Sequence, residues 1–193
     1  GEEMPVAPPL PVLAADSRHL WHPFTHQGLW GGPDDPVVVI ERAEGNELID
    51  SEGRRYLDAI SSLWCNTLGH RVPAIDEAIR AQADRVAHST LLGLSAVPAI
   101  QLAEQLAAPC PGELSRVFFS DAGATAVEVA LKIAAQCARI VEGEATVRRR
   151  FLALDDAYHG DTMGAVSLGF SPGFHRAFEH LTFPVGRLPR DVE

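Results

Sequence analysis

Residues 116–132 read RVFFSDAGATAVEVALK, and this stretch decides the fold of the chain. Its β-favouring start, Arg116–Phe119, is followed by the small-residue turn Ser120–Ala124 and then by residues with helical spacing. Such a strand–turn–helix unit leaves free N–H groups and the positive end of the helix dipole around Gly123 and Ala124. A cup of this kind suits a phosphate group, because small side chains let it approach the backbone. The turn can equally be a plain packing turn, since it matches neither the G-x-G-x-x-G nor the P-loop nucleotide pattern.

The residues on either side of this stretch predict an α/β fold. The continuous apolar run Phe151–Leu154 is typical of a strand buried on both faces in a parallel sheet. With Arg116–Phe119 and the helix between them it predicts a βαβ unit, and ligands bind beyond the carboxyl ends of such strands. Turn signals and apolar periodicity predict the remaining elements, which are β-meander strands at 37–40, 47–50 and 55–58 and helices at 75–87 and 96–106.

Composition and charge exclude several classes of function. The formal net charge is −10 and the only dense basic run is Arg148–Arg150, so we expect no nucleic-acid partner and no anionic-membrane surface. No apolar run approaches the roughly 20 residues of a membrane-spanning helix. The cysteines are widely spaced and no histidines have convincing metal-ligand spacing, so we expect no metal site, no disulfide framework and a cytoplasmic location. The acidic, proline-rich residues 1–16 predict a flexible tail.

A second candidate segment, Tyr158–Thr162, follows the predicted strand at 151–154. The ring of Tyr158 can stack on a flat heteroaromatic group whose phosphate lies in the cup. Gly160 allows a close approach, and Asp161 can accept hydrogen bonds. The alternative is a surface loop in which Asp161 caps a helix. Trp64 can line a pocket or pack in the core, and Cys65 beside it is most simply a small apolar core residue. His22 can equally be a plain surface histidine.

Taken together, these segments resemble the class III, pyridoxal-phosphate (PLP)-dependent aminotransferases of fold type I. Within that family the resemblance is to the branch that aminates 8-amino-7-oxononanoate to 7,8-diaminononanoate in biotin biosynthesis. The Trp-His-Pro and Tyr-His-Gly-Asp-Thr motifs are specific to this branch, whereas the phosphate cup is shared more widely. The resemblance covers nearly everything from Leu20 to Phe183 and is carried by Leu20–Thr25, Tyr56–Ser62, His88–Thr90, Phe118–Glu128 and Ala157–Thr162.

The resemblance implies a domain organisation and a cofactor site. Residues 17–75 would be an N-terminal β-meander segment of the small domain, leading to the active site. Residues 76–193 would be an incomplete PLP-binding large domain with a mainly parallel sheet and flanking helices. Gly123 and Ala124 would bind the cofactor phosphate through backbone N–H groups, and Tyr158 would lie over the pyridine ring.

The resemblance also implies partners. A small-molecule amino donor and a keto acceptor would use one pocket, lined by Pro23, Phe24, Leu63, Trp64, Tyr158 and Asp161. The protein would be a homodimer in which the stretch 88–93 reaches the other subunit's active site, with three residues across the dimer: Thr90, Leu92 and Gly93.

Two departures from the family pattern fall in that pocket. Many members have Tyr where this chain has Phe24, and a Trp-Trp pair where it has Leu63–Trp64. Phe24 lacks a hydroxyl that can hold a polar group of the amino donor, and losing such a hydrogen bond can alter donor choice. We therefore hypothesise that the donor is not S-adenosylmethionine but another amine, such as lysine.

Transamination by this family also needs a lysine that forms a Schiff base with PLP. The only lysine in the sequence is Lys132, and it lies roughly 12 Å beyond the cup along the helix axis. We expect it to be a surface or interface cation, so no catalytic residue is assigned and the chain alone is predicted to be inactive. Because the chain begins with Gly1 and stops at Glu193 without a closing element, we expect an N-terminal portion of a longer enzyme. The alternatives are an inactive truncated remnant, another class III aminotransferase, or an aminomutase of the same fold.

Overall fold

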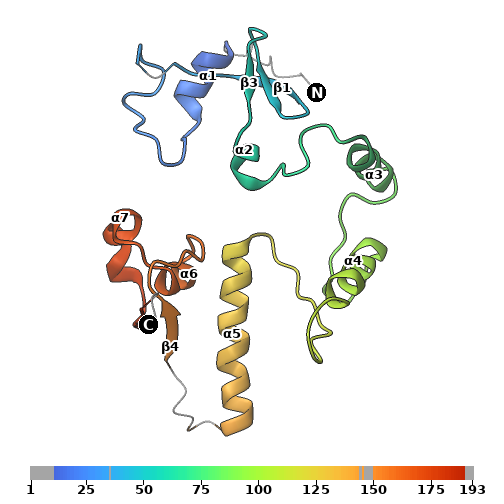
Figure 1. The fold of residues 1–193 in the computed structure, drawn as a ribbon, viewed down its shortest axis with the longest axis vertical. Helices are drawn as coiled ribbons and strands as arrows, with labels where there is room; N and C mark the ends of the chain where they lie inside the picture. The colour runs from blue at the N-terminus through green and yellow to red at the C-terminus, as the bar shows by residue number, and fades with distance from the viewer. Residues whose placement is uncertain (1–10, 35, 144, 146–149, 190–193) are drawn as a thin grey trace, which may run out of the picture. The chain divides into compact units, whose positions relative to one another are not determined.

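The computed structural model describes residues 11–34, 36–143, 145 and 150–189. The chain forms two units, Gly1–Leu94 and Ser95–Glu193, each held by its own internal contacts. Figure 1 labels helices α1–α7 and strands β1, β3 and β4. The expected division into residues 1–16, 17–75 and 76–193 is based on the roles of these segments in the family, whereas the two units are defined by contacts within the chain. The expected division stays a prediction.

The first unit is built on an antiparallel sheet with the strand order β1 (Ile40–Glu44), β2 (Glu47–Asp50) and β3 (Arg55–Leu57). The two-residue turn Gly45–Asn46 sets the register, with Glu44 opposite Glu47, and Gly45 has the positive φ of +56° that such a turn favours. Because pairing runs back from this turn, β1 spans Ile40–Glu44, so the strand predicted at 37–40 is wrong by three residues at its start and four at its end. β2 has its predicted bounds, and β3 ends one residue earlier than predicted.

A buried carboxylate closes the turn between β2 and β3. The side chain of Asp50 is 1% exposed. It accepts hydrogen bonds from the N–H groups of Glu52 (2.9 Å) and Arg54 (2.8 Å), from Arg54 Nε (2.6 Å) and from the Tyr56 hydroxyl (2.9 Å). Burial opposes ionisation of Asp50, but these hydrogen bonds outweigh it and lower its pKa to about 2.

We expect Asp50→Asn to destabilise the protein, and the destabilisation to depend on pH. A carboxyl group whose pKa is lower in the folded than in the unfolded protein stabilises the fold above its unfolded pKa, and this contribution disappears as the pH falls through the folded pKa. The difference in urea midpoint between wild type and Asp50→Asn should therefore be largest above about pH 4 and should shrink as the pH approaches 2. Urea unfolding followed by circular dichroism at stepwise lower pH measures it; a difference that stays constant would contradict the assignment.

Helix α1 (Val12–His19) includes the last residues of the expected flexible tail, 1–16. Residues 12–16 are helical, and residues 1–10 lie outside the described residues. The helix is held to the loop that follows it, because the Asp16 carboxylate bonds to the side chains of His22 and Trp30.

Two further elements lie in the described part of the first unit: α2 (Ser61–Trp64), a single turn with left-handed backbone angles, and the regular helix α3 (Pro73–Ala83). α3 begins at Pro73, two residues before the predicted start, because proline is well tolerated in the first helical turn. It ends at Ala83, four residues before the predicted end.

The second unit combines helices with a parallel pair of strands. β4 (Phe151–Leu154) has its predicted bounds and pairs in parallel with β5 (Val185–Leu188). The long helix α5 (Gly123–Glu142) packs beside α6 (Met163–Leu168), as Figure 1 shows. The remaining elements are α4 (Val97–Ala107), α7 (Pro172–His175) and the 3-10 helix η1 (Arg176–Leu181). The unit is an α/β arrangement, as predicted.

One predicted strand does not form in the part of the chain that the structure describes. Residues 116–119 lie directly before α5, as expected, but they pair with no other strand there. β-favouring side chains allow an extended backbone, yet a strand also needs a hydrogen-bonded neighbour. Phe118 is accordingly 69% exposed.

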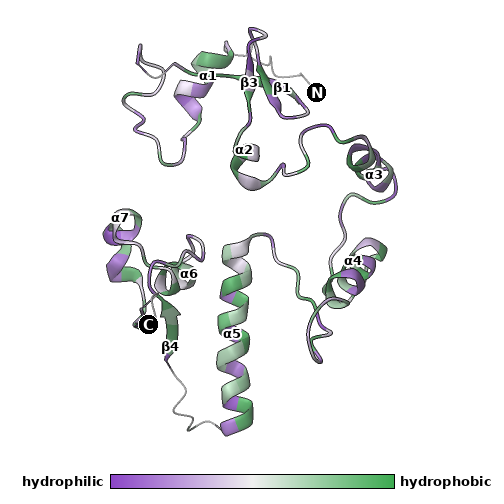
Figure 2. Cartoon of the chain, viewed as in Figure 1, coloured by the Kyte–Doolittle hydropathy of each residue, from purple (hydrophilic) through white to green (hydrophobic). Residues whose placement is uncertain are grey.

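The apolar core is small among the described residues. Its buried apolar members are Ile49, Ala153, Ala165 and Val166. Figure 2 shows the apolar strand β4 and the many apolar positions along α5, of which Ile133 and Ile140 are exposed. In the same part of the chain, no helix is long and apolar enough to cross a membrane. The local backbone geometry therefore depends strongly on hydrogen bonds, ion pairs and close backbone contacts.

Candidate functional site

The turn before α5 leaves the first N–H groups of that helix without a side-chain cap in the described structure. Ala122 occupies the N-cap position with an extended backbone and has no side-chain oxygen. The Thr125 hydroxyl accepts a hydrogen bond from the Ala122 N–H (3.0 Å) and so fixes the turn. A Cβ atom added at Gly123 would meet nothing within 4 Å, so the space there is open. The N–H groups of Gly123 and Ala124 and the helix dipole together suit an anion.

The loop that follows β4 packs directly against this turn. Gly160 has a φ of +107°, and a Cβ atom added there would lie 2.5 Å from Cβ and 2.9 Å from Cα of Ala124. Glycine is the residue that combines this backbone angle with this approach. On the other side, a Cβ atom at Gly169 would lie 2.7 Å from the backbone oxygen of Ala157. The loop is thus held between the start of α5 and the end of α6.

A carboxylate on α5 ties down the end of the same loop. Glu128 accepts hydrogen bonds from the Thr162 hydroxyl (2.7 Å) and from the Gly164 N–H (2.6 Å). The hydrogen bond from Thr162 is the main cause that lowers the pKa of Glu128; burial opposes it, while the Gly164 N–H and the positive charge of Lys132 assist. The loop and the turn before α5 are therefore fixed to one helix.

Tyr158 and Asp161 form a hydrogen-bonded pair within the loop. The Tyr158 hydroxyl donates to Asp161 Oδ2 (2.7 Å), and this bond is the main cause that raises the pKa of Tyr158. Asp161 Oδ1 lies 3.5 Å from Nε2 of the buried His175, whose Nδ1 accepts a hydrogen bond from the Ser171 N–H (3.0 Å). Asp161 does not cap α6, because the N-cap residue of that helix is Thr162. The Tyr158 side chain is 62% exposed, so a ligand can reach its ring.

The predicted pocket residues Pro23 and Phe24 lie in the first unit, in a segment held by α1. Asp16 accepts hydrogen bonds from His22 Nε2 (3.1 Å) and from Trp30 Nε1 (2.7 Å), and the two rings lie 4.1 Å apart between centroids. His22 is therefore a structural partner of Asp16 rather than a plain surface histidine. Phe24 has a φ of +51° and is largely exposed.

The predicted pocket residues Leu63 and Trp64 lie on a left-handed turn of the first unit. The four residues Ser61–Trp64 have φ angles of +51°, +48°, +64° and +71°. None is glycine, and each such residue costs about 1–2 kcal/mol relative to a right-handed conformation. The side chains of Leu63 and Trp64 are 62% and 72% exposed, and Cys65 is exposed as well. The alternative of Trp64 and Cys65 as core residues is therefore wrong for the described structure.

The residues predicted to reach across a dimer lie in the loop after α3. The Thr90 hydroxyl accepts a hydrogen bond from the Leu92 N–H (3.0 Å), and Gly93 has a φ of +76°. Leu92 is exposed. Among the residues that the structure describes, no group of three or more His, Cys, Asp or Glu side chains could hold a metal ion.

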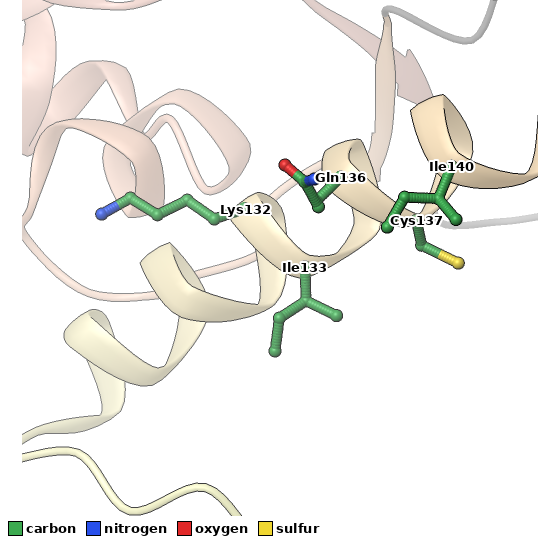
Figure 3. A pocket seen from close by; sticks show the side chains of 5 residues that line it. All are labelled: Lys132, Ile133, Gln136, Cys137 and Ile140. Carbon is green, nitrogen blue, oxygen red and sulfur yellow. The ribbon is translucent and has the colours of Figure 1, made fainter. Parts of the chain in front are cut away.

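Lys132 lies on the side of α5, away from its first turn. With Ile133, Gln136, Cys137 and Ile140 it lines a hollow along this helix (Figure 3). The spacing of these residues places them on one helix face, and none of the predicted cofactor residues belongs to the hollow. The position agrees with the expectation of a surface or interface cation.

The structure brings together one of the two predicted groups of site residues. Gly123 and Ala124 lie beside the loop that carries Tyr158 and Asp161, all in the second unit. The pocket residues at 23–24 and 63–64 belong to the first unit. Sequence reasoning gave no role to the side chains that hold these segments, because their hydrogen-bond partners cannot be read from local sequence, even for Asp58 and Glu128, which lie in segments that carry the resemblance. These side chains are Asp16, Asp58, His70, Glu128 and His175.

Comparisons with known proteins give the chain a family. The profile of the family "Aminotransferase class-III" matches residues 31–193. An adenosylmethionine-8-amino-7-oxononanoate aminotransferase of Nitratidesulfovibrio vulgaris is 55% identical over 179 residues, which are 92% of this chain and 32% of that protein. The crystal structure of the enzyme of the same name from Methanocaldococcus jannaschii is 44% identical with a TM-score of 0.84, covering 91% of this chain and 39% of the other.

A third similar protein is an amine transaminase from an uncultivated Pseudomonas species, solved in a PLP-bound form. It is 35% identical with a TM-score of 0.74, covering 89% of this chain and 38% of the other. The chain thus spans about a third of the length of the Nitratidesulfovibrio relative, and somewhat more of the two solved structures.

Proposed function

The chain belongs to the class III aminotransferase family, and we propose that the protein aminates 8-amino-7-oxononanoate to 7,8-diaminononanoate, a step of biotin biosynthesis, with PLP as its cofactor. The observation that carries the proposal is the contact of Gly160 with Ala124, which sets the Tyr158 loop against the uncapped start of α5. Two relatives named for this substrate, at 55% and 44% identity, support the choice of acceptor.

The residues at the start of α5 fit the phosphate group of PLP. The N–H groups of Gly123 and Ala124 would hold it, and the open space at Gly123 would admit it. The helix dipole favours the negative charge without a cationic side chain.

The loop after β4 would hold the ring of the cofactor. Tyr158 would lie over the pyridine ring, and its hydrogen bond to Asp161 would fix the orientation of the tyrosine side chain. When bound, PLP supplies the carbonyl group and electron-withdrawing ring through which an amino group passes from donor to acceptor. Glu128 keeps the loop at the distance from α5 that both contacts need.

Pro23, Phe24, Leu63 and Trp64 would line the substrate side of the site. The candidate donors are adenosylmethionine, which the name of the relatives contains, lysine and other amines. Phe24 offers no hydroxyl to a polar donor group, so an amine other than S-adenosylmethionine, such as lysine, stays our predicted donor.

We further propose a cytoplasmic homodimer. The loop with Thr90, Leu92 and Gly93 would meet the second subunit, and the exposure of Leu92 supports this proposal. In such a dimer this loop would contribute to the other subunit's site.

The test is an assay of the protein produced from its complete gene. We expect 7,8-diaminononanoate to form from 8-amino-7-oxononanoate only when PLP is present, with mass spectrometry as the measurement. Single-turnover reactions with each donor should show at least a tenfold preference for lysine, about 1.4 kcal/mol. A clear preference for S-adenosylmethionine would contradict the donor; no product with any donor would contradict the function and favour an inactive remnant.

A further inference from the structure

The left-handed turn Ser61–Trp64 is held by backbone hydrogen bonds, such as that from the Trp64 N–H to the Ile60 oxygen (2.8 Å), and by one aspartate, Asp58. Asp58 Oδ1 accepts a hydrogen bond from the Ser62 N–H (2.8 Å), and Oδ2 accepts one from the Ser62 hydroxyl (2.8 Å). Oδ2 also lies 2.8 Å from Nε2 of His70. The side chains of Asp58 and His70 are 5% and 13% exposed, so water competes little for the contact between them, whereas the two hydrogen bonds to Ser62 lie at the surface.

The two members of this pair are anchored to the same place in the sheet. The Asp58 N–H donates to the backbone oxygen of Asn46 (2.8 Å). His70 exchanges two backbone hydrogen bonds with Gly45, at 2.7 and 3.2 Å. Gly45 and Asn46 form the turn between β1 and β2. This hairpin therefore anchors the hydrogen-bonded pair Asp58–His70, which we call the clamp.

The clamp acts on a backbone that would otherwise relax. Ser61, Ser62, Leu63 and Trp64 all have positive φ angles, which side-chain-bearing residues rarely adopt in succession. Strain of this kind persists only where surrounding contacts over-determine it, and it concentrates at ligand-binding sites. Here the result is that two large apolar side chains, Leu63 and Trp64, are exposed rather than packed into the unit.

We propose that Asp58 and His70 are positioning residues that hold the turn Ser61–Trp64 in its left-handed form and so present Leu63 and Trp64 to the substrate. The inference rests on the proposed function, because it assigns the exposed side chains to that substrate site. Asp58 touches no reacting atom and acts only through Ser62. Its loss should therefore weaken substrate binding more than it slows turnover.

The test compares wild type with Asp58→Asn in the protein produced from its complete gene. We expect the KM for 8-amino-7-oxononanoate to rise about tenfold, with kcat changed less than about threefold, the pattern of lost substrate binding. Affinity for pyridoxamine 5′-phosphate, a cofactor form with no aldehyde to react, should stay within about twofold. Asp76→Asn on α3 is the matched control, since it removes an aspartate that pairs with Arg71 in the same unit; it should leave KM unchanged.

A second substitution, to glycine, shows whether Asp58→Asn acts by misplacing the turn or by lowering the stability of the whole protein. Glycine adopts positive φ angles without penalty. Adding Ser61→Gly to Asp58→Asn should therefore reverse at least half of the rise in log KM that Asp58→Asn causes. If Asp58→Asn fails to fold, Ser62→Ala removes only the hydroxyl bond to Asp58 and should raise KM by a smaller factor. A rescue that does nothing, or a fall in kcat with KM unchanged, would overturn the proposal.

Hydrogen exchange tests the clamp without any substrate. In Asp58→Asn, the amides of residues 62–66 should exchange at least tenfold faster, while those of β2 should keep their protection. Unchanged exchange in 62–66 would overturn the inference even if the enzyme is active. Faster exchange in a protein that does not act on 8-amino-7-oxononanoate would support the clamp and contradict only the proposed function.

Discussion

Gly160→Ala is expected to lower affinity for pyridoxamine 5′-phosphate by about 10- to 100-fold. The φ of +107° at this residue strains any side chain, and the new Cβ atom would lie 2.5 Å from Cβ of Ala124. The backbone angle costs alanine about 1–3 kcal/mol, and crowding against the helix costs a similar amount. The loop must move away from α5, and Tyr158 moves with it. Calorimetric titration measures the loss.

The control for this substitution is Gly173→Ala on α7. A Cβ atom at Gly173 would meet nothing within 4 Å, so affinity and melting temperature should change little. Affinity of the wild-type level in Gly160→Ala would mean that the contact of the loop with α5 does not set the cofactor site.

The elements near the phosphate cup could be predicted because their signals are local. α5 begins at Gly123, where the small-residue turn ends, and β4 has the bounds of the apolar run Phe151–Leu154. Gly160 is expected from the sequence to let a ligand approach, and in the structure the same glycine lets the loop approach α5 at Ala124. In each case a few neighbouring residues determine the backbone.

The remaining features depend on partners that are distant in sequence. β1 is displaced from Val37–Ile40 because the Gly45–Asn46 turn, not β-propensity, sets the pairing. Helix α1 depends on Asp16 meeting Trp30, 14 residues later. The left-handed turn beginning at Ser61 contains no glycine or asparagine to signal it. It is bonded to Asp58, whose own partner His70 lies 12 residues further along the chain.

Gly123→Asp should abolish most of the contribution of the phosphate to cofactor binding while leaving the fold intact. Gly123 is the first residue of α5, and no atom crowds a side chain there. Aspartate is favoured in a first helical turn, where it interacts with the dipole, so the melting temperature should stay equal or rise. Its charge about 5 Å from a phosphate would cost about 3 kcal/mol at an effective dielectric constant of about 20, or roughly a hundredfold in affinity. Gly173→Asp adds the same charge to α7, which holds none of the proposed phosphate-binding residues, and should have little effect.

The most direct test of the phosphate cup compares two ligands that differ only in the phosphate. Pyridoxamine 5′-phosphate and pyridoxamine are titrated into wild type and Gly123→Asp. We expect wild type to prefer the phosphorylated ligand strongly and Gly123→Asp to lose about a hundredfold of that preference, with pyridoxamine bound equally by both. A preference that survives in Gly123→Asp, with the protein folded, would contradict the assignment of the start of α5 as the phosphate site.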